Sequence, residues 1–380
     1  MGKVVASFLL LGLPFYPAFA NGLNFSGSLE RLTEDSISIR LADRRIIDAK
    51  PASTGELAAD KIARRYKFGD HVEIACDRIQ PSWEDASARL QFLELKTLRF
   101  IREASADELS GMRQLPAWRE EANLLQRPHT PDIAVEGPAG APNVTARGPE
   151  AEGLRKLERA REVNLDYAAN LPNFIADETA KRYTSDTRST RWHYIDTIEA
   201  EVTFQKNRAT RVQVRRNGRK WDRPFQALPG FKWGGGFGAE IRPLFDLQCP
   251  TRIQYDGPAE IRGRPALKFN FDSPADGCFN DFYVEYQRYN PARTGHISID
   301  DRSGNLIHLE EDASPFPAEF DFARRQEEVS WDSVKIGDAS YLLPVAANFV
   351  VDYSSGKRWR VEVEYKNHRH FESSTDITFH

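Results

Sequence analysis

Residues 154–174 read LRKLERAREVNLDYAANLPNF, a run that passes from a helical to a strand-like pattern. Apolar side chains recur at three- and four-residue intervals up to position 171, with Arg and Glu between them. This spacing predicts an amphipathic helix of about five turns. Strand-like segments then continue almost to the end of the chain. Because a helix and a long antiparallel meander must share one core, we expect a curved half-barrel wrapped around a helix over residues 151–380.

The expected strands of this half-barrel are separated by turns, which is typical of a mainly β, α+β fold. WGGGFG at 233–238 predicts a flexible turn that leads into a short helix over 239–247, and FPAEF at 316–320 predicts a second turn or a helical start. The strands are expected at 174–183, 197–204, 210–214, 252–255, 266–271, 282–289, 294–299, 305–309, 327–334, 341–349 and 359–371.

The N-terminal part, residues 21–126, contains five more strand-like segments, at 25–32, 36–41, 45–48, 66–76 and 90–101. Since a short antiparallel sheet commonly removes its edges by closing, we expect a small OB-like β-barrel. An Ala-rich insert at 52–62 has a helical composition. Ser105 and Glu108 form a capping-box pattern, which predicts a helical tail that runs to residue 125.

A segment rich in proline and glycine separates these two parts. Residues 127–150 hold five prolines and three glycines, with no cluster of large apolar side chains. Such a segment cannot bury enough surface to fold alone, so we interpret it as a linker. The chain of 380 residues is also longer than one ordinary core. The sequence therefore predicts two domains.

The first twenty residues have the three parts of a secretory signal. Lys3 is followed by an apolar run at 4–13 and by Ala18-Phe19-Ala20, a small-x-small cleavage site. The apolar run is about half the length that a membrane span requires, and no cysteine near the cleavage site can carry a lipid anchor. We expect cleavage after Ala20, a mature chain without a transmembrane segment, and a periplasmic or secreted location.

Charge and cysteine content narrow the class of protein further. The net charge of -4 argues against nucleic-acid binding and against a polybasic membrane clamp. Three cysteines are an odd number for an oxidising compartment. Cys249 and Cys278 flank two expected strands of one domain, so they either form a disulfide or remain two buried thiols. Cys76 lies in the other domain, and no CxxC or Cys/His cluster indicates a metal site.

Several short motifs carry a resemblance to known proteins. They are DYAANLPNF at 166–174, GRPALKFNF at 263–271, YNPA at 289–292, GHISID at 295–300, GNLIHL at 304–309 and YLLPV at 341–345. In these, the chain resembles a group of uncharacterised secreted proteins of acidobacteria. The strand ending in Ile-Asp, the turn ending in Gly and the following strand are also similar to the lipoprotein carrier and regulator superfamily of LolA, LppX and RseB. This resemblance covers residues 154–380 and implies a helix-filled half-barrel with a hydrophobic concavity for an acyl chain.

Signatures of enzymes are absent from the sequence. There is no GxSxG, HExxH, Walker loop or Rossmann glycine pattern, and no cofactor or catalytic residue is expected. His368 and His370 share one face of the last expected strand, and acidic pairs stand at 300–301 and 310–311. Without further ligands nearby, we interpret all of these as ordinary polar surface residues rather than as metal ligands.

Two sets of residues are candidates for ligand binding. Aromatic side chains flank the glycines at 234–236 and either form a lid over an apolar pocket or pack in the core; they are Phe225, Phe231, Trp233, Phe237 and Phe245. Arg211 and Arg215 share one face of an expected strand. They make either a contact for acidic lipid headgroups or anionic glycans, or a solvated sheet edge that resists aggregation.

Three functions remain open at this point. The first is a non-enzymatic carrier or sensor of lipid, lipoprotein or another apolar ligand in the cell envelope, with peripheral membrane contact, and it requires a deep apolar concavity. The second is a scaffold for envelope proteins, with a filled half-barrel and an exposed patch. The third is an unrecognised hydrolase, which needs a polar cleft where acid, base and nucleophile converge.

Overall fold

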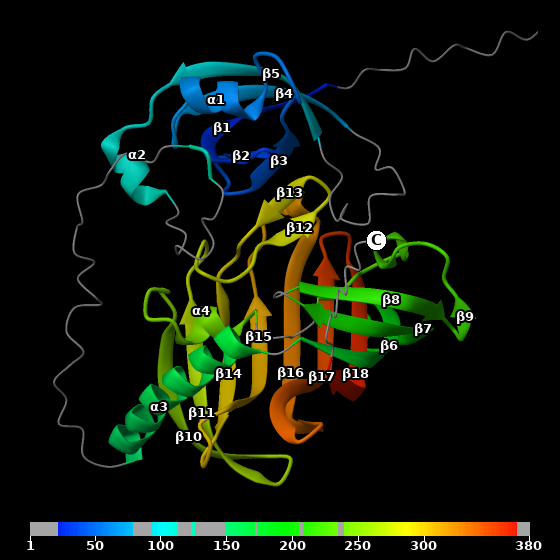
Figure 1. Cartoon of the computed structure of the whole chain (residues 1–380). Helices are drawn as coiled ribbons and strands as arrows, with labels where there is room; N and C mark the ends of the chain where they lie inside the picture. Colours follow the sequence, from blue (N-terminus) through cyan, green and yellow to red (C-terminus); the bar gives the residue numbers. More distant parts are fainter. Residues whose placement is uncertain are drawn as a thin grey trace, which may run out of the picture.

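The computed structural model describes residues 22–78, 93–112, 123–125, 149–171, 173–205, 208–234 and 239–370 (Figure 1). The expected export signal and nearly all of the expected linker lie outside these residues. The chain is mainly β, as the sequence predicts, with a small N-terminal barrel above a large curved antiparallel sheet (Figure 1).

The N-terminal barrel is built from five strands. They are β1 (Leu23–Leu32), β2 (Ile37–Arg40), β3 (Ile46–Lys50), β4 (His71–Arg78) and β5 (Leu93–Arg102). β1 pairs with both β2 and β4, and a short parallel pairing of β3 with β5 closes the sheet. Alternating residues of β4, such as Val72, Ile74 and Cys76, are buried inside. Burial raises the pKa of the Cys76 thiol to about 12, which keeps it protonated and unreactive.

Two short helices accompany the barrel, α1 (Ala59–Arg65) and α2 (Ala106–Gly111). The predicted capping box at the start of α2 is confirmed: Glu108 N donates to Ser105 Oγ at 3.2 Å, and Ser105 N donates to Glu108 Oε2 at 2.8 Å. α2 ends at Gly111, well before the expected end at residue 125, and residues 113–122 are outside the described part.

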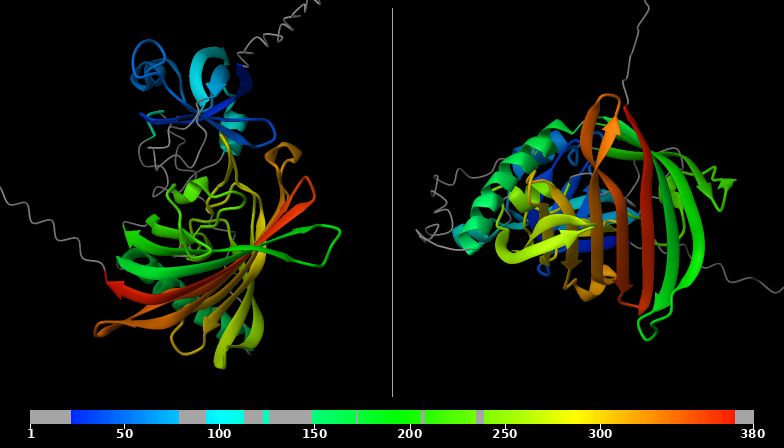
Figure 2. Two further views of the ribbon diagram at one scale, coloured as in Figure 1. Left: turned by 90° about the vertical axis from the view of Figure 1, so that its right-hand side faces the viewer. Right: turned by 90° about the horizontal axis from the view of Figure 1, so that it is seen from below.

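Eleven strands form the large sheet, all paired antiparallel, in the order β10-β11-β14-β15-β16-β17-β18-β6-β7-β8-β9. Figure 2 shows them as one strongly curved layer, the half-barrel, and its inward-facing side chains make up the large core cluster. The strands are β6 (Phe174–Asp186), β7 (His193–Gln205), β8 (Arg208–Arg216), β9 (Arg219–Lys220), β10 (Arg252–Ile261), β11 (Arg264–Ser273), β14 (Arg293–Asp300), β15 (Leu306–Ala313), β16 (Phe322–Ile336), β17 (Ala339–Tyr353) and β18 (Lys357–His370).

Helix α3 (Pro149–Asn170) packs against β10 and against the short helix α4 (Ile241–Phe245) (Figure 1). A Cβ atom at Gly153 would lie 2.5 Å from the ring of Tyr255, so glycine permits the close approach to β10. The buried Asn164 donates to Gly304 O at 2.9 Å and accepts from Leu306 N at 2.9 Å, which fixes the helix to the β14–β15 turn. The helix begins at Pro149, inside the segment interpreted as linker.

A hairpin from the half-barrel extends the sheet of the small barrel. Residues 282–289 were expected to be one strand, but they form β12 (Phe282–Val284) and β13 (Gln287–Tyr289), with a turn at Glu285, whose φ is 51°. β13 pairs with β3 through Gln287 and Arg288, and Tyr286 belongs to the core cluster of the barrel. The two parts of the chain are therefore joined by a continuous seven-stranded sheet.

Buried charges reinforce this junction. The guanidinium of Arg288 donates to Asp48 at 2.8 Å, to Asp281 at 2.7 Å and to Ser38 Oγ at 3.0 Å. Nearby, Arg40 of the barrel donates to Asp276 at 2.8 Å. Asp276 lies two residues before Cys278, which forms a disulfide with Cys249. The disulfide thus holds the half-barrel loop that contacts the barrel.

Candidate functional site

The concave face of the half-barrel is covered by one segment of the chain. This covering segment, residues 221–245, connects β9 to β10 and is described at 221–234 and 239–245. Its only regular elements in the described part are the 3-10 turn η2 (Phe225–Ala227) and the short helix α4 (Ile241–Phe245). Large apolar side chains along it are buried in the core cluster: Phe225, Leu228, Phe231, Trp233, Ile241, Leu244 and Phe245.

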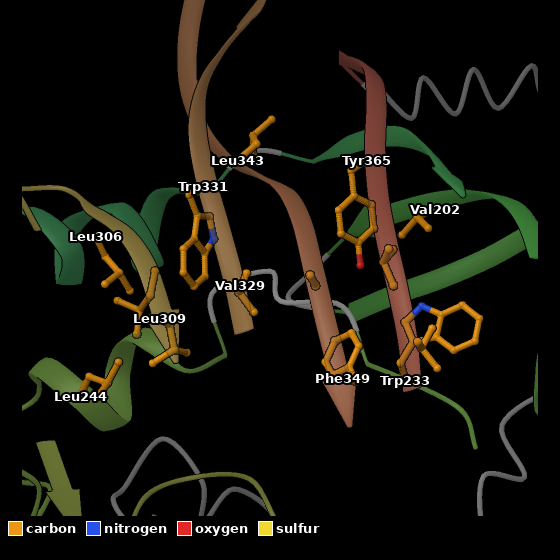
Figure 3. Packing of buried hydrophobic residues seen from close by; sticks show 14 of the residues in the cluster. Val202, Trp233, Leu244, Leu306, Leu309, Val329, Trp331, Leu343, Phe349 and Tyr365 are labelled. Atoms are coloured by element: carbon orange, nitrogen blue, oxygen red, sulfur yellow. The ribbon is translucent and has the colours of Figure 1, made fainter. Parts of the chain in front are cut away.

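Figure 3 shows how this packing is made. Trp233 and Leu244 of the covering segment lie among inward-facing residues of the sheet, including Val202, Val329 and Phe349. Of the aromatic residues predicted to line a ligand site, four are therefore buried between the covering segment and the sheet, whereas Phe237 lies outside the described residues. The sequence leaves a lid and core packing as alternatives. The four described side chains are packed in the core, and they belong to the segment that covers the concave face.

Three clusters of inward-facing charged residues line the same interface. The first is centred on Arg182 of β6, whose side chain is fully buried (0% exposed). Its Nε and Nη2 each donate to Asp196 of β7 at 2.7 Å, and its Nη1 donates to Pro229 O of the covering segment at 2.8 Å. Arg216 completes the cluster with a 2.6 Å bond to Asp196. Burial alone would raise the pKa of Asp196, but the two guanidinium groups lower it overall.

The covering segment approaches the sheet closely beside this cluster, at Gly230. Gly230 has a φ of 82°, and a Cβ atom there would lie 2.2 Å from the ring of Trp359 on β18. The guanidinium of Arg182 also lies 5.6 Å from the centre of that ring. Because both the backbone conformation and the space require glycine, this position fixes where the covering segment meets the sheet.

The second cluster pairs Arg211 of β8 with Glu178 of β6 by two bonds of 2.7 Å. Nη2 of Arg211 also donates to Gly234 O of the covering segment at 3.0 Å. The guanidinium lies 4.5 Å from the ring of Phe225 and 5.5 Å from that of Trp233. Arg211 therefore holds both the backbone and the aromatic side chains of the segment in place.

The expectation that Arg211 and Arg215 share one face is wrong. Gln213 between them has a φ of 52°, and the register with β7 shifts between Glu199 and Glu201. Such a bulge reverses the inside-outside alternation of a strand. Arg211 consequently points into the half-barrel, while Arg215 is exposed on the other side.

The third cluster contains three carboxyl groups and two guanidinium groups. Glu240 of the covering segment faces Glu311 of β15 and Glu327 of β16, together with Arg293 and Arg325. Glu311 accepts from Arg293 at 3.2 Å and from Arg325 at 3.4 Å, and Arg325 also donates to Glu327. Oε2 of Glu240 is buried and has no hydrogen-bond partner in the described part of the chain.

This arrangement stabilises the protonated form of Glu240. Burial, followed by repulsion from Glu327 and Glu311, raises its pKa to about 8. Since two guanidinium groups neutralise two of the three carboxylates, one proton balances the cluster near neutral pH. The covering segment is thus bonded to the sheet at Pro229 and Gly234 through buried arginines, and its Glu240 faces the third cluster.

The charged residues of the sheet were missed by the sequence reading, although a signal for them exists. In β6 the inward-facing positions run Phe174, Ala176, Glu178, Ala180, Arg182. Charged side chains in the phase of buried apolar ones are unusual, because burying a charge is costly unless it is paired. The alternation of buried and exposed positions along each strand therefore distinguishes these buried charged residues from charged residues of the surface.

A polar groove of about 820 Å³ lies over β14–β17. It is lined by a serine, a histidine and several carboxylates, the kinds of group that a hydrolase uses. Ser314 Oγ donates to Asp312 at 3.1 Å, and His296 Nδ1 contacts Asn270 Oδ1 at 2.6 Å. Neither contact joins a hydroxyl to an imidazole, which is the first requirement of a nucleophile-base pair. Beside the groove, His308 Nδ1 lies 3.0 Å from Ser330 Oγ and its Nε2 lies 3.2 Å from Glu310 Oε1, so a hydroxyl, an imidazole and a carboxylate do meet there, with Ser330 buried.

The remaining candidate residues have structural contacts. His368 contacts Pro344 O at 3.2 Å, and burial lowers its pKa, so it is neutral. Asp300 caps the β14–β15 turn by accepting from Ser303 N at 2.8 Å, and Asp301 pairs with Lys156. Within the described ranges, no group of three or more His, Cys, Asp or Glu residues is arranged to hold a metal ion. Within them, too, no helix has the length and apolarity of a membrane span.

No family model and no curated protein matches the chain. Among solved structures, it is similar to a putative outer membrane lipoprotein-sorting protein domain from Vibrio parahaemolyticus, with 10% identity, coverage of 59% of this chain and 95% of that chain, and a TM-score of 0.32. It is also similar to a DUF1329 family protein from Desulfovibrio piger, with 9% identity, coverage of 60% of this chain and 95% of that chain, and a TM-score of 0.30. A third similar structure is a LolA superfamily protein from Nitrosomonas europaea, with 10% identity, coverage of 60% of this chain and 97% of that chain, and a TM-score of 0.28. Because these identities and TM-scores are low, the function proposed below rests on the geometry of this chain.

Proposed function

We propose that this chain is a non-enzymatic binding protein of the cell envelope, whose half-barrel takes up an apolar ligand such as a lipid or the acyl chain of a lipoprotein. The observation that carries the proposal is the covering segment. It places seven buried apolar side chains on the concave face without joining the sheet as a strand. This is also the function that the sequence resemblance implies.

Displacement of the covering segment by a ligand is physically reasonable. Burial of apolar surface does not depend on direction, so an acyl chain can replace the contacts of Phe225, Trp233 and Leu244 with the sheet. In the described part of the segment, Arg182 and Arg211 of the sheet donate to its backbone at Pro229 O and Gly234 O, and Trp221 N donates to Val214 O of β8 at 2.9 Å. Both arginines keep their carboxylate partners on the sheet when the segment leaves.

We further propose that the protein works outside the cytoplasm. The export pattern of residues 1–20 is one support. The Cys249–Cys278 disulfide is a second, because such bonds persist mainly in oxidising compartments. The small barrel is proposed to be OB-like, on the ground of its five closed strands with a helix between β3 and β4.

Two observations favour the alternative of a protein scaffold. The concave face is filled by the covering segment, as a scaffold requires. On β5 of the barrel, Phe100 and Ile101 are each 47% exposed, and adjacent exposed apolar side chains are a feature of protein-binding surfaces. A scaffold of this kind would leave the concave face permanently filled. The two functions therefore differ in whether the covering segment can be displaced.

The direct test is to measure binding of a fatty acid and to extract the purified protein for mass spectrometry of bound lipid. Trp233→Ala weakens the packing of the covering segment by about 3–5 kcal/mol. If the ligand must displace this segment, the variant binds the fatty acid at least fivefold more tightly than the wild type.

Phe320→Ala is the matched control. Phe320 is also fully buried and lies in the 3-10 turn η3 (Ala318–Phe320), outside the covering segment. We expect it to lower stability without improving fatty-acid binding. Absence of any bound or added lipid in the wild type and in Trp233→Ala would reject the proposal, and so would equal effects of the two substitutions.

A further inference from the structure

Three turns at one corner of the half-barrel concentrate positive charge. Residues 186–194, 215–223 and 354–357 form the β6–β7 turn, the β8–β9 turn and the β17–β18 turn, which together we call the basic corner. In Figure 1 its β9 projects from the side of the half-barrel. The corner contains two acidic residues, Asp186 and Asp222, against eight basic ones: Arg188, Arg191, Arg215, Arg216, Arg219, Lys220, Arg223 and Lys357. The whole chain, by contrast, has a net charge of -4.

Hydrogen bonds hold the three turns together as one surface. Thr187 N donates to Gly356 O at 2.8 Å, which ties the β6–β7 turn to the β17–β18 turn. Asn217 of the β8–β9 turn bonds to Thr197 of β7 in both directions, with its N donating at 2.8 Å and its Oδ1 accepting at 2.8 Å. The backbone positions that carry the positive charges are therefore fixed by these bonds.

Much of this charge is not neutralised within the protein. Arg216 pairs with Asp196 and Lys220 with Asp222. Arg188, Arg191, Arg215 and Arg219 are exposed and make no ion pair with any residue of the described ranges. Four adjacent arginines without acidic partners produce a local field that attracts anions, even though the chain as a whole is acidic.

Aromatic side chains with polar edges lie in the same corner. The ring of Trp192 lies 5.1 Å from the guanidinium of Arg358 and 5.0 Å from that of Arg360. Tyr194 is 55% exposed. Tryptophan and tyrosine favour the region of lipid headgroups, where one part of the ring meets apolar chains and the other meets water.

We propose that the basic corner docks the protein on a membrane surface that contains anionic phospholipids. The turns project and contain arginines mixed with Trp192 and Tyr194, which suits a broad surface of phosphate groups and acyl chains. The corner is also connected to the covering segment, because Arg216 binds Asp196, Asp196 binds Arg182, and Arg182 binds Pro229 O. The inference goes beyond the proposed function, which concerns the concave face alone.

The test is co-sedimentation of the full chain with vesicles of phosphatidylcholine, with and without phosphatidylglycerol. We expect binding to the anionic vesicles that weakens with salt. Arg188→Ser, Arg191→Ser, Arg215→Ser and Arg219→Ser combined should reduce this binding at least tenfold, since each basic residue near such a surface contributes about a fivefold factor. The matched control removes four exposed basic residues elsewhere: Lys61→Ser, Arg64→Ser, Arg262→Ser and Lys335→Ser.

Equal loss in the corner variant and the control variant would overturn the proposal, as would equal binding to neutral and anionic vesicles. Displacement by inorganic phosphate at constant ionic strength would also overturn it, because it would indicate a site for a free anion. Fatty-acid binding by the corner variant is measured in parallel. If the corner variant still binds the fatty acid but the wild type does not bind anionic vesicles, the membrane inference is wrong and the proposed function stands.

Discussion

At the scale of single residues, the half-barrel depends on ionised groups in unusual positions. Arg182, Arg211 and Arg325 point to the interior, where an unpaired charge would be prohibitively costly. Each is paired with a carboxylate of the sheet, so the sheet itself satisfies these charges. The contacts to the covering segment are additional, which makes them suitable for being broken and remade.

Glu240 gives the covering segment a dependence on pH. In the folded protein it keeps its proton up to a pKa of about 8, whereas an ordinary glutamate loses it near 4.5. The folded state thus binds one proton more between these values, and its stability falls as the pH rises from 4.5 to 8. We expect Glu240→Gln to remove this loss, so that its free energy of unfolding near pH 8 exceeds that of the wild type by about 3–5 kcal/mol.

Thermal unfolding measured from pH 5 to 9 tests this expectation. Glu34→Gln, at an exposed position of the barrel, is the control and should follow the wild type. If Glu240→Gln also follows the wild type across the whole range, Glu240 is not protonated in the folded protein.

Single residues also show why part of the site was not predictable. The clustering of Phe225, Phe231, Trp233 and Phe245 near glycines drew attention to this segment, but it left open whether these side chains form a lid or pack in the core. Arg215 was predicted on the wrong face of its strand, because a bulge at Gln213 shifts the alternation of faces by one residue. A bulge has no regular sequence pattern from which it could be predicted. The pairing of Arg211 with Glu178 joins positions that are 33 residues apart, so it appears only in the folded chain.

At the scale of elements, the β12–β13 hairpin is the part that most changes the expected organisation. The pattern at 282–289 correctly indicated extended structure, but the positive φ at Glu285 divides it into two strands. Its partner β3 lies about 240 residues earlier in the sequence. A pairing over such a distance leaves no local pattern, whereas the capping box of α2 lies within four residues and was predicted.

Arg288 is the residue on which this hairpin depends. Arg288→Met leaves Asp48 and Asp281 buried without their guanidinium partner, which should cost about 3–5 kcal/mol in the free energy of unfolding. The measurement is urea-induced unfolding, in which we also expect the barrel to unfold separately from the half-barrel.

Arg44→Met is the matched control at the same junction. Arg44 is 60% exposed and lies 3.9 Å from Asp276, so its loss should cost about 0–1 kcal/mol. An Arg288→Met protein as stable as the control, with a single transition, would contradict the role assigned to the hairpin.

The disulfide supports the same junction from the half-barrel side. Cys249 and Cys278 are separated by 29 residues, and opening a loop of this size should cost about 2–4 kcal/mol. We expect a Cys249→Ser, Cys278→Ser protein to match the wild type in reductant. A reductant-dependent change in the double variant as well would mean that another group is responsible.

At the scale of the whole molecule, the sequence predicted two β structures and the curved sheet around a helix, because alternating and helical periodicities are local. It did not predict that the chain would cover its own concave face or that one sheet would join the barrel to the half-barrel. Both features arise from tertiary packing. The barrel, the disulfide and the hairpin lie next to a segment that packs seven buried apolar side chains against the concave face of the sheet.

Hydrogen–deuterium exchange of the full chain, with and without a bound fatty acid, measures the displacement of this segment most directly. We expect faster exchange at 225–234 and 241–246 when the fatty acid is bound, with no change in the barrel strands, because the ligand takes the place of the covering segment on the sheet. Binding of the fatty acid with unchanged or slower exchange in these residues would contradict it.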